Sequence, residues 1–302
     1  MTGLPVHGVL VVDKPEGPTS HDVVATARRA LATREVGHTG TLDPMATGVL
    51  ALVVGRATRL AQFLSGGDKV YDARVRLGVT TDTWDRTGAV LAEAAGDRPL
   101  PSLAAVTGAA CGLLGEREQA PPPYSAKKVG GTPAYALARR GRDVEIRPVR
   151  VTLHAIDITA FEPPFVGVRL RCSGGYYVRA LAQELGRLLG CGACLHDLRR
   201  QASGEFDLDW AVSLELLVRD PAEAVSRLIP VEALLGDWPA VALNDAGARR
   251  AGHGNEIGPD DVIGQRPPGG GPVRLFGPDG GLLAIAEPAD RPGFLHPRVV
   301  LK

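Results

Sequence analysis

Asp43 is a single carboxylate inside a segment of small and turn-forming residues, EVGHTGTLDPMATGVL, at positions 35–50. Nearby glycines permit tight turns, and Pro44 biases the residue before it toward extended backbone, so this carboxylate is expected on irregular backbone between regular elements. A carboxylate exposed in this way can act as a nucleophile in covalent catalysis. The structural alternative is a turn-forming aspartate, since Asp is common among Gly and Thr in turns.

The composition is that of an ordinary globular protein, with 44% hydrophobic and 23% charged residues in a chain of 302. Lys plus Arg and Asp plus Glu both number 34, so the net charge is zero and any anionic partner must be met by a local patch. The chain has only four cysteines, no charged-then-apolar leader and no apolar run of about 18 residues, which argues against secretion and membrane spanning. We therefore expect a cytoplasmic protein that does not associate with membranes.

Cys191 and Cys194 form a single C-x-x-C pair. A structural zinc site needs four ligands, and neither a second cysteine pair nor a histidine pair follows at the required spacing. Reduced thiols in a turn at the end of a helix are the expected outcome, with no metal.

Periodic patterns predict the elements that must position Asp43. Residues 7–14 (HGVLVVDK) and 49–54 (VLALVV) are apolar runs typical of buried strands, and between them a helix is expected from an N-cap at Ser20 to about Thr33. Period-two alternation over residues 71–77 and 166–172 predicts two more strands, with Tyr71 on the apolar face of the first. A further helix is expected from helical spacing closed by Gly190, at Tyr177, Leu181, Leu185 and Leu188.

These elements follow one another without a regular β-α-β alternation, which predicts an α/β mixed (α+β) fold with a central, largely antiparallel sheet flanked by helices. The stretch LLGDWPAV at 234–241 indicates a hinge between two domains, at residues 1–234 and 235–302. Apolar alternation around GPDGG predicts a hairpin in a small β-rich second domain. Within it, RPPGGGP at 266–272 is expected to be a mobile loop.

Five motifs, in order across residues 8–204, resemble those of the tRNA pseudouridine synthase B family. They read GVLVVDKPEGPTSHDVV, GHTGTLDPMATGVL, KVYDARVRLGVTTDTWDRTG, QAPPPYSAKKVGGTPAYALARRG and CSGGYYVRALAQELGRLLGCGACLHDLRR. The resemblance implies a pseudouridine synthase catalytic domain followed by a small PUA-like RNA-binding domain. It also implies an enzyme, without cofactor or metal, that converts the uridine at position 55 in the T loop of tRNA to pseudouridine. The T arm of tRNA is thus the implied partner, and the protein is expected to act as a monomer.

The resemblance also assigns roles by motif position. It implies that Asp43 is the nucleophile, Tyr71 the ring stacked on the target base, Tyr177 a second active-site tyrosine and Arg179 the partner of Asp43. Adjacent tyrosines at 176 and 177, with Ala180 where the family usually has Thr, leave open which tyrosine faces the pocket; Tyr177 is favoured because it directly precedes Val178 and Arg179.

The remaining implied residues contact RNA. His38 is expected to fill the space that the flipped nucleotide vacates, and no second ligand beside it supports a metal site. Residues 124–150 carry seven basic and two acidic side chains, a net charge of +5. This segment is expected to bind phosphates and make tRNA affinity fall with salt, although a solvated charged surface is the alternative. The RNA-binding set is His38, Lys127, Lys128, Arg139, Arg140, Arg142 and Leu198.

The chemistry fits these assignments. Extruding a base from its stack costs a few kcal/mol, and stacking it on Tyr71 recovers roughly 1 to 3 kcal/mol. Burial beneath RNA would raise the pKa of Asp43, so Arg179 is expected to keep this carboxyl ionised through a bidentate pair that Lys cannot copy. A glycosidase would require two flanking carboxylates, whereas the loop offers one.

One rival function remains open, and a second is discounted. A non-catalytic tRNA-binding or tRNA-folding module would have no need for Asp43, Tyr71, Tyr177 and Arg179 together. A nucleotide-binding enzyme would use the glycine-rich loop as a phosphate cradle, but neither G-x-G-x-x-G nor G-x-x-x-x-G-K-[ST] occurs there.

Overall fold

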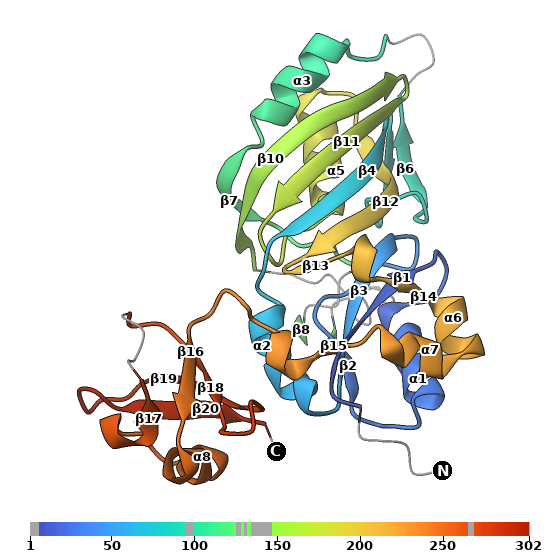
Figure 1. Cartoon of the computed structure of the whole chain (residues 1–302). Helices are drawn as coiled ribbons and strands as arrows, with labels where there is room; N and C mark the ends of the chain where they lie inside the picture. The colour runs from blue at the N-terminus through green and yellow to red at the C-terminus, as the bar shows by residue number, and fades with distance from the viewer. Residues whose placement is uncertain are drawn as a thin grey trace.

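A computed structural model describes residues 6–94, 99–124, 128–129, 132–133, 147–264 and 269–301. The largest feature of these residues is an eleven-stranded sheet (Figure 1). Its main path runs β14 (Val212–Ser213), β1 (Gly8–Lys14), β3 (Thr47–Val54), β12 (Ala193–Ser203), β4 (Lys69–Leu77), β11 (Phe165–Cys172), β10 (Val149–Glu162) and β7 (Gly115–Gln119). Three short strands join it from the side: β2 (Val36–His38) on β3, β13 (Phe206–Asp207) on β12 and β15 (Ile229–Pro230) on β1.

The pairings in this sheet are antiparallel except for two among the described strands, which join β1 to β14 and β12 to β3. The expected mixed fold with a largely antiparallel central sheet is therefore confirmed.

Burial explains why the sequence of β1 is continuously apolar while that of β4 alternates. On β1, Leu10 and Val12 pack in one core cluster, while Val9 and Val11 face the opposite cluster. The strand is covered on both faces, so it has an unbroken apolar sequence. In contrast, β4 alternates buried and half-buried residues, because only one of its faces is covered. Tyr71 lies on that covered face, as predicted.

Helices cover the sheet at both ends (Figure 1). Helix α5 (Val178–Leu188) packs on β12 and β4, and α3 (Leu103–Cys111) packs on β10 and α5. Helices α1 (Ser20–Ala30) and α6 (Leu214–Arg219) lie together near β1, next to α7 (Pro221–Ser226). The other described elements of this part are η1 (Gly55–Leu60), α2 (Ala61–Leu64), η2 (Leu208–Trp210), η3 (Val231–Ala233), and the hairpins β5 (Val79–Thr81) with β6 (Val90–Glu93) and β8 (Lys128–Val129) with β9 (Thr132–Pro133). Within the described ranges, none of the helices has both the length and the apolar character needed to cross a bilayer.

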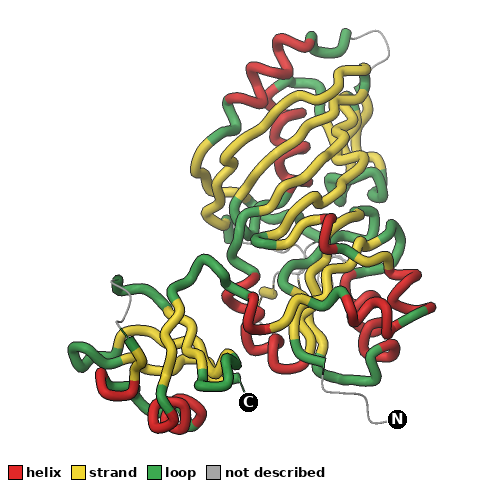
Figure 2. Tube along the Cα trace, in the orientation of Figure 1, coloured by secondary structure: helices red, strands yellow, loops and turns green. Residues whose placement is uncertain are grey.

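The C-terminal part is rich in strands (Figure 2). A five-stranded sheet has the order β17 (Val262–Ile263), β16 (Ala240–Leu243), β18 (Val273–Phe276), β19 (Leu282–Pro288) and β20 (Leu295–Val300), with α8 (Asp245–Gly252) and η4 (Pro259–Asp261) beside it. The predicted hairpin around GPDGG is confirmed, since β18 and β19 pair antiparallel. Leu282, Ile285 and Leu301 belong to the same buried cluster as Val9 and Val11. Strand β20 contacts η1, so the C-terminal part packs on the first part through this short helix. The division at residue 235 and the PUA-like character stay predictions. Residues 265–268, which include part of the expected mobile loop, lie outside the described residues.

Candidate active site

The N-terminus of α1 differs from the sequence prediction. Thr19, not Ser20, is the N-cap: Thr19 Oγ1 accepts a hydrogen bond from Asp22 N at 3.1 Å, and Asp22 Oδ2 accepts one from Thr19 N at 2.9 Å. The prediction of Ser20 was wrong because the acid that completes a capping box lies three residues after Thr19. The helix also ends at Ala30, three residues before the expected Thr33. Ser20 is buried, and its hydroxyl bonds the main chain of Leu42 instead.

The segment that carries Asp43 is irregular and connects β2 to β3, as predicted. Neighbouring residues hold its main chain from several directions. Besides Ser20, Gly17 N donates to Pro44 O at 2.9 Å and Lys14 Nζ donates to the same carbonyl at 3.3 Å. Lys14 is fully buried, and this burial lowers its pKa to about 8. The loop consists mainly of small and turn-forming residues, but these hydrogen bonds fix the position of its main chain.

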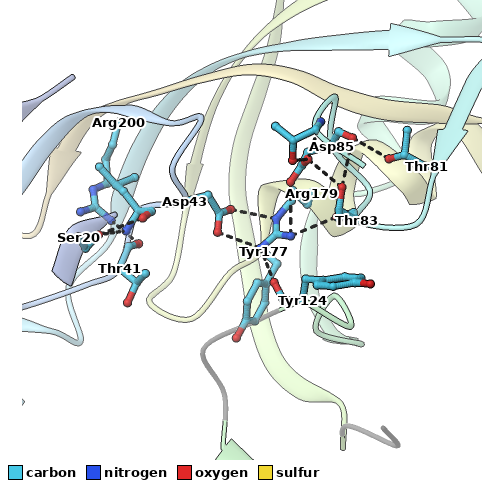
Figure 3. A network of polar contacts seen from close by, with 12 residues as sticks. Ser20, Thr41, Asp43, Thr81, Thr83, Asp85, Tyr124, Tyr177, Arg179 and Arg200 are labelled. Carbon is cyan, nitrogen blue, oxygen red and sulfur yellow. Dashed lines mark hydrogen bonds and ion pairs between the residues drawn. The ribbon is translucent and has the colours of Figure 1, made fainter. Parts of the chain in front are cut away.

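Arg179 forms the predicted bidentate pair with Asp43 (Figure 3). Its Nη2 lies 2.9 Å from Oδ1 and its Nε 2.9 Å from Oδ2. The Arg179 side chain is 6% exposed and that of Asp43 is 31% exposed. The carboxylate therefore remains accessible, although the cation that pairs with it is buried. Arg179 also donates to the carbonyl oxygens of Thr83 at 3.1 Å and Tyr124 at 2.9 Å, which fixes the plane of the guanidinium.

A second buried acid, Asp85, lies on the other side of Arg179, and the sequence reasoning missed it. Its Oδ2 is 3.5 Å from Arg179 Nη1, while its Oδ1 accepts hydrogen bonds from Thr83 Oγ1 at 2.8 Å and from the amide and hydroxyl of Thr87 at 2.9 and 2.6 Å. The available signal was an acid in the same motif as Tyr71, TTDTWDRTG. The spacing around Asp85 is also that of an ordinary turn aspartate, and its partner Arg179 is distant in the chain.

Burial raises the pKa of the Asp43 carboxyl above its ordinary value. The Arg179 guanidinium opposes this effect most strongly, Asp85 adds to it through like charge, and Lys14 opposes it. Arg179 therefore limits the rise in pKa without cancelling it.

A cavity of about 290 Å³ opens beside this pair. Its lining includes the predicted residues Asp43, Tyr71, Tyr177, Arg179 and Leu198. Asp43 is the one carboxylate among the described residues that line it, because Asp85 lies behind Arg179. The arrangement can deliver a single carboxylate oxygen to a bound group while keeping it paired with a cation.

Both tyrosines at the start of α5 reach the cavity. Tyr176 is 7% exposed and also borders a neighbouring cavity, whereas Tyr177 is half-buried and is the N-cap of the helix. Gln119 holds Tyr177 in place, since Gln119 Oε1 accepts from Tyr177 N at 2.7 Å and Gln119 Nε2 donates to Tyr177 O at 3.1 Å. Figure 3 shows the Tyr177 ring beside the Asp43–Arg179 pair. Preference for Tyr177 stays a prediction.

Tyr71 is 6% exposed, and burial raises its pKa. His38 lies on β2 outside the cavity lining, and its Nδ1 is buried without a hydrogen-bond partner in the described structure. Burial lowers the pKa of His38, so the imidazole favours its neutral form. Its role as an RNA contact stays a prediction.

Most of the basic segment at 124–150 lies outside the described residues. Lys127, Arg139, Arg140 and Arg142 lie outside the described residues, and Lys128 is described only as part of β8. Cys191 and Cys194 are free thiols; Cys191 follows α5, but Cys194 lies within β12 and not in the expected turn. Across the described ranges, no group of three or more His, Cys, Asp or Glu side chains could hold a metal ion.

Comparisons with known proteins show the family of this chain. Residues 28–178 match the model of the TruB family pseudouridylate synthase N-terminal domain, and residues 179–235 match that of the tRNA pseudouridylate synthase B C-terminal domain. The tRNA pseudouridine synthase B of Solibacter usitatus (strain Ellin6076) is 43% identical over 298 residues, covering 97% of this chain and 99% of the relative. That of Symbiobacterium thermophilum (strain DSM 24528 / JCM 14929 / IAM 14863 / T) is 48% identical over 252 residues, or 82% of each chain.

Solved structures share the fold. A chain in the archaeal box H/ACA sRNP Nop10-Cbf5 complex aligns with a TM-score of 0.72 and 24% identity, covering 99% of this chain and 87% of that chain. One in a Cbf5-Nop10-Gar1 complex aligns with a TM-score of 0.69 and 26% identity, covering 93% and 78%.

Proposed function

The chain belongs to the TruB family of pseudouridylate synthases, and we propose that its target is the uridine at position 55 in the T loop of tRNA. It is a tRNA pseudouridine synthase, an isomerase that converts a tRNA uridine to pseudouridine. The finer choice of position 55 and of the T arm is supported by the five motifs that resemble the family. The protein acts as a monomer in the cytoplasm.

The observation that carries the proposal is the Asp43–Arg179 pair at the edge of a cavity that Tyr71 also lines. Isomerisation breaks the bond between C1′ and N1 of the nucleoside, rotates the uracil and joins C5 to the same sugar carbon. C5 then loses its proton and N1 gains one, so that no atom is added or removed overall. A single carboxylate nucleophile can divide this change into two easier steps, either by attack on the sugar or by attack on the base. The single carboxylate in the described lining favours this route over a glycosidase mechanism with two acids.

The other site residues have supporting roles in this proposal. Tyr71 stacks on the extruded uracil, and this stacking recovers roughly 1 to 3 kcal/mol of the cost of extruding the base. Arg179 orients the carboxylate of Asp43 and opposes the rise in its pKa. Tyr177 contacts the substrate from the start of α5, and Leu198 forms part of the apolar lining of the cavity. His38 and the basic segment contact the RNA outside the cavity.

One assay tests the function. Purified protein is incubated with a T-arm RNA hairpin, without added cofactor or metal, and pseudouridine is mapped by chemical labelling. Wild type should modify the T-loop uridine. Asp43→Asn should fold and bind the hairpin but give no product, while Asp209→Asn, at an exposed acid, should match wild type. Product from Asp43→Asn would exclude the nucleophile role. Binding without product from wild type would favour a non-catalytic RNA-binding module.

A further inference from the structure

Arg200 is a buried cation of the active-site cavity whose role is not explained by the chemistry above. It is 1% exposed and lines the cavity. Its nitrogens donate to three carbonyl oxygens: Nε to Val49 O at 2.7 Å, Nη1 to Thr41 O at 3.3 Å and Nη2 to Gly40 O at 3.0 Å. No acidic side chain pairs with it within the described residues. Burying a charge without an opposite charge is costly, and the three carbonyl contacts offset only part of this cost. The burial of the Arg200 cation therefore needs a reason beyond stability.

Two of those carbonyls belong to the loop that carries Asp43, and the third belongs to the strand that follows it. Gly40 and Thr41 precede the acid, and Val49 follows it in β3. One planar guanidinium therefore holds both sides of the loop at once. Arg has five N–H donors in a fixed plane and can satisfy separate acceptors in this way, whereas a Lys ammonium presents three donors from a single point.

The main chain of Arg200 joins the same loop to the strand of Tyr71. In the β12–β4 pairing Arg200 lies opposite Tyr71, and in the β12–β3 pairing it lies opposite Gly48. The approach to Gly48 is close, because a Cβ there would lie 2.2 Å from Arg200 O. Arg200 thus occupies the point where the strand bearing Tyr71 and the loop bearing Asp43 come together.

We propose that Arg200 is a positioning residue, which fixes the Asp43 carboxylate relative to Tyr71 through its contacts with Gly40, Thr41 and Val49. The inference depends on the proposed roles of Asp43 and Tyr71. Arg200 acts through the geometry of the loop and contacts neither the nucleophile nor the reacting atoms. Displacing reacting groups by about 1 Å can lower a rate by about 100-fold, so the loss of these contacts should appear in the chemical step.

The test compares Arg200→Lys and Arg200→Met with Arg199→Lys. Arg199 is the matched control, since it lies on the same strand and makes a bidentate pair with Asp13 outside the cavity lining. For each variant, tRNA affinity, single-turnover rate at saturating protein, the pH dependence of that rate and the melting temperature are measured. Rates are taken well below the melting temperature.

Arg200→Lys should lower the single-turnover rate by roughly 10- to 100-fold, and Arg200→Met by more. Affinity for tRNA should stay within about twofold of wild type, because the phosphate contacts are unchanged. The pH at which the rate falls in acid should not move, in contrast to variants of Arg179. Arg199→Lys should match wild type. If Arg200→Met does not fold, the rate of Arg200→Lys alone tests the positioning role, because this variant keeps the buried cation.

A wild-type rate in Arg200→Lys would overturn the inference. So would a rate loss explained entirely by weaker tRNA binding or by a smaller folded fraction, since either would show a purely structural role. Failure of the proposed function is distinguishable, because then the wild-type protein itself would give no pseudouridine with the hairpin.

Discussion

Ser20 binds both main-chain polar groups of Leu42, the residue before Asp43. The Ser20 hydroxyl accepts a hydrogen bond from Leu42 N at 2.8 Å and donates one to Leu42 O at 2.9 Å. The two residues are 22 positions apart, so the contact fastens the start of α1 to the loop of Asp43.

Ser20→Ala should destabilise the protein and slow catalysis. The change leaves a buried amide and a buried carbonyl of Leu42 without their partner, which costs about 1 to 3 kcal/mol. The loop gains freedom as a result, so kcat should fall more than tRNA affinity. Urea denaturation and single-turnover kinetics would measure both effects. Ser226→Ala, at an exposed helix end, is the control. Unchanged stability in Ser20→Ala would contradict this account of the contact.

The pH dependence of the rate should report Asp43. A nucleophilic carboxylate is inactive when protonated, so the rate rises with pH through its pKa, which burial raises. Arg179→Lys loses the bidentate contact and Arg179→Met loses the opposing charge altogether, so both should raise that pKa further and move the acid limb to higher pH, Met more than Lys. Single-turnover rates measured from acid to neutral pH would show the order. A limb that stays in place would exclude Asp43 as the group that titrates.

Asp85→Asn should move the same limb in the opposite direction. The negative charge of Asp85 adds to the rise in the pKa of Asp43, so an uncharged amide should lower that pKa and shift the acid limb to lower pH. The rate on the plateau should still fall, by roughly tenfold, because Arg179 loses a charged contact that orients its guanidinium toward Asp43. Asp82→Asn is the control, since Asp82 accepts from Ala89 N in the same turn. An upward shift of the limb would contradict the electrostatic assignment.

Gly48→Ala should destabilise the fold strongly. Gly48 has a φ of 100°, which disfavours any side chain, and a Cβ there would lie 2.2 Å from Arg200 O, so β3 and β12 would have to separate. A loss of more than about 2 kcal/mol in the free energy of unfolding is expected. In Gly108→Ala the new Cβ meets nothing within 4 Å on α3, so this control should be neutral or slightly stabilising. Equal effects of the two changes in urea denaturation would contradict the packing argument.

Local patterns in the sequence determined much of the secondary structure. The period-two alternation of β4, the apolar runs of β1 and β3 and the closure after α5 at Gly190, with a φ of 68°, all follow from contacts within a few residues. Motif resemblance placed Asp43, Tyr71, Tyr177 and Arg179 in one catalytic site and Leu198 among the RNA-binding residues, and the structure brings all five to one cavity.

Only the tertiary structure revealed the contacts that set the chemistry of the site. Asp85 resembles a turn residue until α5 places Arg179 beside it, 94 positions later in the chain, and Arg200 resembles any strand arginine until β12 lies between β3 and β4. The pKa of Asp43 likewise depends on burial and on charges from three distant segments. Sequence spacing describes neighbours along the chain, whereas burial and electrostatics depend on neighbours in space, so the balance of charges around the carboxylate is decided by the fold.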